Sequence, residues 1–90
     1  MFEYNIHPDN SYEHFKKACK YVEDTFGDNL VKERLLVDVD GTQIQVYNTP
    51  KGEIKIFNDT ALGFGGWVCA CSDFEINNPE WKRSKFKKVF

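Results

Sequence analysis

The first regular pattern along the chain is an apolar stripe with helical spacing. Apolar residues recur every three or four positions from Tyr12 to Phe26, which places them on one face of a helix. Asn10 and Glu13 resemble a capping box at its start. The pattern therefore predicts an amphipathic helix at about 11–26.

After this helix the hydrophobic period changes to two, which is typical of strands. Apolar and polar residues alternate on both sides of Asp40-Gly41, a dipeptide that favours a two-residue hairpin turn. Because such a turn fixes the strand register, it also assigns each side chain to a face of the sheet. The predicted inner face, covered by the helix, contains Leu35, Val37, Val39, Ile44 and Val46.

A second hairpin and a fourth strand follow. The sequence Pro50-Lys51-Gly52 fits a three-residue loop, in which proline presets φ and glycine takes the left-handed position. This loop pairs Val46 with Ile56, so that the aliphatic inner face continues. Alternation predicts a further strand at about 67–76.

The end of the chain has the residue types of a helix start. Asn78-Pro79-Glu80 fits the N-cap and the first two positions of a short helix, which would carry Trp81, Phe86 and Val89. We therefore expect a single α+β domain over 1–90. Its N-terminal helix packs on a four-stranded antiparallel meander sheet, and a short C-terminal helix follows.

The second face of this predicted sheet is more apolar than antiparallel sheets usually are. Either the C-terminal helix folds back over it, or it binds a second copy of the chain or another protein. The candidate partner-binding residues are Leu36, Tyr47, Phe57 and Trp67.

Composition and charge narrow the function classes only slightly. Ninety residues are enough for one domain. The net charge of −2 gives no strong overall attraction to nucleic acid or acidic membranes. The beginning of the chain lacks a basic stretch followed by an apolar run, so no secretory signal is predicted. An odd number of cysteines, three, favours a reducing cytoplasm. The excess of lysine over arginine is typical of an AT-rich genome, such as that of a low-GC bacterium or its phage.

No motif predicts a catalytic, cofactor-binding or metal site. The glycines of 63–66 precede a predicted strand and lack a neighbouring lysine, whereas phosphate loops precede a helix. Cys69 and Cys71 supply only two of the four ligands that structural zinc needs. Asp38 and Asp40 belong to the predicted hairpin, so we expect a structural role for them.

A basic tail suggests nucleic acid as an alternative partner. Residues 82–88 hold five of the twelve basic residues, and basic grooves with aromatic platforms bind single strands. The candidate phosphate contacts are Lys82, Arg83, Lys85, Lys87 and Lys88. No ribonucleoprotein-type motif accompanies them.

The leading hypothesis is a small non-enzymatic protein-binding module that occupies the surface of a partner. An inhibitor or accessory protein of a phage or mobile element would have this form. Its partner would be another protein or a second copy of the chain as a homodimer. No cofactor is expected, and nucleic-acid binding through the tail and the sheet aromatics is the alternative.

Overall fold

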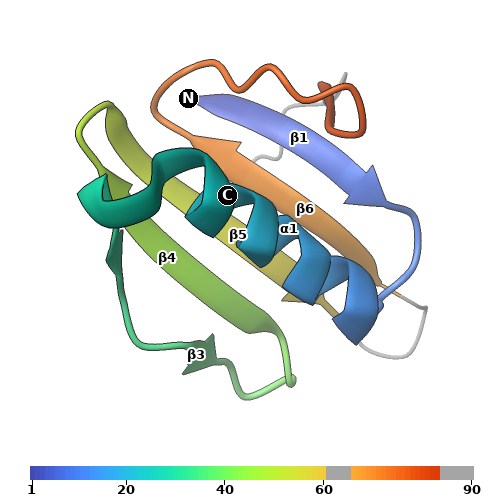
Figure 1. Cartoon of the computed structure of the whole chain (residues 1–90). Helices are drawn as coiled ribbons and strands as arrows, with labels where there is room; N and C mark the ends of the chain where they lie inside the picture. The colour runs from blue at the N-terminus through green and yellow to red at the C-terminus, as the bar shows by residue number, and fades with distance from the viewer. Residues whose placement is uncertain (61–65, 84–90) are drawn as a thin grey trace.

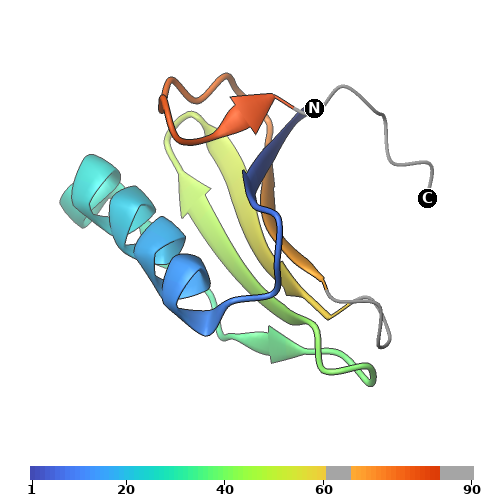
Figure 2. The same cartoon turned by 90° about the vertical axis from the view of Figure 1, so that its right-hand side faces the viewer.

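The computed structural model describes residues 1–60 and 66–83. In this part of the chain, one α-helix, α1 (Tyr12–Phe26), packs on one face of a seven-stranded antiparallel sheet (Figures 1 and 2). The strands are β1 (Phe2–His7), β2 (Val31–Lys32), β3 (Leu36–Val37), β4 (Gln43–Thr49), β5 (Gly52–Asp59), β6 (Trp67–Ser72) and β7 (Lys82–Arg83). Their order across the sheet is β2-β4-β5-β6-β1-β7. Strand β3 also pairs with β4, at the N-terminal end of β4, whereas β2 pairs with its C-terminal end. The expected four-stranded meander with a short C-terminal helix is therefore wrong.

Helix α1 forms where the apolar stripe predicts it. The hydroxyl of Ser11 accepts a hydrogen bond from the backbone N–H of His14 at 3.3 Å, so Ser11 is the N-cap instead of Asn10. The helix ends at Gly27 and continues into one 3-10 turn, Gly27–Asn29. Its buried face consists of Phe15, Ala18 and Val22.

The first hairpin turns one residue earlier than expected. The N–H of Gly41 donates to the carbonyl of Asp38, and the N–H of Asp38 donates to the carbonyl of Thr42, both at 2.9 Å. Val39 and Asp40 are thus the central residues of the turn, and Gly41 follows as a left-handed bulge residue with φ 88°. The Asp-Gly pair is compatible with either turn, and the choice shifts the register by one residue.

The second hairpin shows the same kind of shift. Thr49 pairs with Gly52 around a two-residue turn, and Tyr47 pairs with Ile54. Because a one-residue slip exchanges the two faces of a strand, Tyr47 points towards the helix, whereas Val46 points away from it. The assignment of Val46 to the inner face is therefore wrong, while Ile54 and Ile56 on β5 lie on the helix side as predicted.

The first strand and the last described strand pair at the opposite edge of the sheet. Strand β1, which the sequence analysis missed, pairs with both β6 and β7. Residues 82–83 form β7 in place of the expected helix; the backbone makes only one turn before it, in which the N–H of Trp81 donates to the carbonyl of Asn78 at 3.0 Å. Phe86 and Val89 lie outside the described residues.

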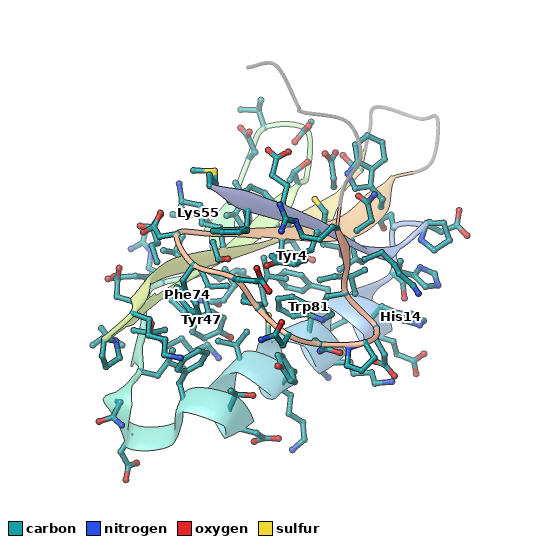
Figure 3. All side chains as sticks on the ribbon, turned by 90° about the horizontal axis from the view of Figure 1, so that it is seen from above. Tyr4, His14, Tyr47, Lys55, Phe74 and Trp81 are labelled. Carbon is teal, nitrogen blue, oxygen red and sulfur yellow. The ribbon has the colours of Figure 1, made fainter. Side chains whose placement is uncertain are left out.

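The core lies between α1 and the sheet, and Trp81 closes one side of it. The Trp81 ring is 5% exposed and packs against Tyr4 and Tyr21, with ring centroids 5.9 Å and 5.2 Å apart. Figure 3 shows Tyr47, Phe74 and Trp81 on the helix side of the sheet and Lys55 on the opposite side. Trp81 therefore does not cover the outer face, which rules out one of the two alternatives that the sequence left open for it. No helix among the described residues is long and apolar enough to cross a membrane.

Candidate functional site

The edge of the sheet formed by β2 and β3 carries most of the exposed apolar side chains in the described part of the chain. Five of the seven exposed large hydrophobic residues there belong to the segment 31–39, called the apolar edge below. Val39 is fully exposed, and 63% of the surface of Val37 is exposed. The five residues are Val31, Leu35, Leu36, Val37 and Val39. The expectation that Leu35, Val37 and Val39 belong to the core is wrong.

The width of one helix explains this exposure. An α-helix with its side chains is about 10–12 Å across, and neighbouring strands are about 4.8 Å apart. One helix therefore covers two or three strands, and α1 lies over the centre of the sheet (Figure 1). The strands at the β2–β3 edge are left uncovered. The sequence predicts only one long helix, so the incomplete coverage of the sheet could have been predicted as well.

A bulge interrupts the apolar edge. The edge chain contains one residue more than the part of β4 that it faces between the β2 and β3 pairings. The backbone N–H of Glu33 donates to the carbonyl of Val46 at 2.9 Å, and the side-chain amide of Gln45 donates to the carbonyl of Glu33 at 2.6 Å. These bonds hold the bulge against β4, so the edge is a fixed feature of the fold.

Strand β3 presents unpaired backbone groups on its outer side. In an antiparallel ladder, successive residues direct their backbone groups alternately towards and away from the neighbouring strand. The N–H of Asp38 donates to Thr42 on the β4 side, so the backbone groups of Val37 point away from β4. In the described part of the chain, β3 pairs with β4 alone. Such an edge can accept a further strand.

A groove with a volume of about 720 Å³ separates α1 from the apolar edge. Tyr12 and Lys16 line it on the helix, and Leu35 lines it on the edge. At its side, the Tyr47 hydroxyl donates to the Glu23 carboxylate at 2.6 Å, and the Lys32 ammonium lies 3.2 Å from the same carboxylate. The hydrogen bond from Tyr47, with the nearby Lys32, lowers the pKa of Glu23. Burial and the bond to Glu23 raise the pKa of Tyr47.

Two of the three cysteines, Cys19 and Cys71, have a raised pKa. Burial raises the pKa of Cys19, which lies on α1 beside the groove, and it also raises the pKa of Cys71 on β6. A thiol with a raised pKa is protonated at neutral pH and reacts slowly. Among the described residues, no group of three or more His, Cys, Asp or Glu side chains is arranged to hold a metal ion.

The outer face contains only part of the partner-binding set expected from the sequence. Phe57 and Trp67 are half-buried on the face away from α1, and Leu36 is exposed at its border. Tyr47 is completely buried on the helix side, so its expected position was wrong. A hollow of about 550 Å³ on the outer face is lined by residues of the central strands, such as Phe57 and Cys71, and by residues of the N-terminal segment and of the turn at 38–42.

The residues expected to bind nucleic acid are only partly described. Lys82 and Arg83 are exposed on β7, and the Arg83 guanidinium lies 4.7 Å from the centre of the Phe2 ring. Because Tyr47 is buried, it is not available to stack on a base. Lys85, Lys87 and Lys88 lie outside the described residues, as do the glycines of 63–65.

Protein-family models, curated proteins and solved structures were compared with the chain, and none of them matches it.

Proposed function

We propose that this chain is a small, non-enzymatic protein-binding module that occupies the surface of its partner through the apolar edge. The observation that supports it is the concentration of exposed aliphatic side chains on 31–39, next to backbone groups of β3 that have no strand partner in the described chain. Exposed apolar patches on small proteins are typical of interaction sites. A partner strand would satisfy these backbone groups and cover the side chains at the same time.

The neighbouring groove enlarges this surface. Leu35 belongs to both, and the exposed ring of Tyr12 lies on the helix side of the groove. Aromatic residues beside an aliphatic strip are a common composition for the centre of an interface. The position of Leu36, Phe57 and Trp67 extends the same apolar character to the outer face, whose role as a binding surface stays a prediction.

The experiment is affinity capture with the purified protein as bait in lysate of the organism that encodes it, followed by mass spectrometry. Val37→Lys places a charge in the middle of the apolar edge, and we expect it to abolish specific capture. The matched control is Asn77→Lys, which adds the same charge at an exposed site in the segment before β7, away from the apolar edge and the groove, and we expect it to retain most of the capture. If wild type and V37K capture the same proteins in equal amounts, the apolar edge is not the binding surface.

A further inference from the structure

The charges of the apolar edge change sign along the segment. Its first part carries the basic residues Lys32 and Arg34 with the acidic Glu33 between them, and its last part carries Asp38, which Asp40 follows just outside the segment. The Glu33 carboxylate already accepts a hydrogen bond from the side-chain amide of Asn48 at 2.7 Å. Lys32 is occupied by Glu23, whereas Arg34 has no ion-pair partner among the described residues. An edge with this order of charges is complementary to itself only when it runs in the opposite direction.

We propose that the partner of the apolar edge is a second copy of this chain, paired antiparallel about a two-fold axis near Leu36. This proposal rests on the proposed function, since it names the occupant of the same edge. Reversal about Leu36 places Arg34 of each copy opposite Asp38 of the other. A parallel arrangement would bring like charges together, which disfavours it.

The apolar residues fit the same arrangement. Pairing about Leu36 brings Leu35 of one copy opposite Val37 of the other, and these two residues flank the axis symmetrically. An isologous contact needs one self-complementary patch instead of two different ones. The outward backbone groups of Val37 would enter the ladder between the two copies.

Asp38 can contact the second copy without giving up its hydrogen bond in the turn. One oxygen of the Asp38 carboxylate accepts the N–H of Val39 at 2.8 Å. A carboxylate has further acceptor sites, so Asp38 can retain this bond and accept from a guanidinium. The bulge at 33–35 limits the length of the ladder, so side chains near the axis must supply most of the contact.

Sedimentation equilibrium of the purified chain tests the proposal. We expect the apparent mass to rise with concentration from that of a monomer towards twice that value. Arg34→Asp and Asp38→Arg should each be monomeric, because each gives the segment charges of a single sign around the axis. An equimolar mixture of the two variants should associate, at least ~10-fold more tightly than either alone, because their charges are complementary in both pairs.

The controls separate this proposal from the proposed function. Lys51→Asp changes a charge in the turn between β4 and β5, at the end of β4 far from the proposed axis at Leu36, and should dimerise like wild type. Circular dichroism must show that each variant is folded; if D38R is not, Leu36→Lys replaces it and should give a monomer. A wild-type mass that stays monomeric at all concentrations overturns the dimer, even if lysate capture succeeds. Variants that dimerise like wild type, or a mixture that stays monomeric, overturn it as well.

Discussion

Tyr47 on β4 and Glu23 on α1 are joined by a hydrogen bond of 2.6 Å from the phenolic hydroxyl to the carboxylate. The tyrosine is completely buried, and the carboxylate lies at the rim of the groove, where Lys32 also contacts it. The bond satisfies the polar end of a buried aromatic side chain. It also links the helix to the part of the sheet that borders the apolar edge.

Tyr47→Phe should lower the free energy of unfolding by about 1–2 kcal/mol, since a hydrogen bond to a charged group is lost but the carboxylate can bind water instead. Denaturation by urea measures the change. The matched control is Tyr12→Phe, which removes the hydroxyl of an exposed tyrosine and should cost less than about 0.5 kcal/mol. Equal losses in the two variants would contradict a stabilising role for the Tyr47 bond.

The same contact predicts a dependence of stability on pH. The pKa of Glu23 is lowered from its ordinary value of 4.5, first by the Tyr47 hydrogen bond. The unfolded chain therefore takes up the proton at a higher pH than the folded one. The stabilisation from Glu23 is complete above pH 4.5 and is lost as the pH falls through the lower folded-state pKa.

Glu23→Gln isolates this effect. The variant should show a flatter decline in its urea midpoint than wild type as the pH is lowered below 4.5. Asp40 also has a lowered pKa, because its carboxylate accepts a hydrogen bond from Thr42. The stability that is lost when Asp40 takes up a proton is the same in wild type and E23Q, so it cancels in the comparison. Parallel pH profiles for wild type and E23Q would show that Glu23 does not contribute.

Local signals made the helix predictable. The apolar stripe of α1 and a capping residue at its start require only a few neighbouring residues, so Tyr12–Phe26 follows from the sequence almost to the residue. The alternation on β6 likewise places Val68 and Ala70 on the helix side. Strand β1 carries the same kind of signal, because Phe2, Tyr4 and Ile6 alternate with polar residues, and it could have been identified.

The register of the hairpins could not be decided in the same way. Asp40-Gly41 forms either a two-residue turn or the last part of a turn with a bulge. The difference is one residue, and the same one-residue shift at the second hairpin moves Tyr47 from the outer face to the core. Leu36, Phe57 and Trp67 thus lie away from the helix as predicted, whereas Tyr47 does not. The assignment of Leu35, Val37 and Val39 to the core was wrong, because alternation identifies a strand but not its distance from the helix.

The two tryptophans should differ in their contribution to stability. Trp81 is buried between β1 and α1, and Trp81→Ala should cost about 3–5 kcal/mol because it opens a cavity in the core. Trp67 is half-buried on the outer face, so Trp67→Ala should cost less than half as much. Guanidinium denaturation of both variants provides the measurement. If W67A loses more free energy of unfolding than W81A, Trp67 on the outer face stabilises the fold more than Trp81 does, and the prediction is wrong.

Two valines provide the most direct test of the apolar edge. Val68 on β6 is completely buried, whereas 63% of the surface of Val37 on β3 is exposed. The two substitutions to alanine remove the same atoms, so the environment alone decides the difference. Val68→Ala should cost about 2–3 kcal/mol through lost burial and a residual cavity. Val37→Ala should change the stability of the monomer by less than about 0.5 kcal/mol.

The measurement must separate folding from association. Urea denaturation at low protein concentration reports on the monomer, and a repeat at high concentration adds any contribution from binding between copies. Val37→Ala should then lose stability relative to wild type only at high concentration, because Val37 contributes to the contact and not to the core. If V37A is as destabilised as V68A at low concentration, Val37 belongs to the core of the monomer and is not part of an exposed binding edge.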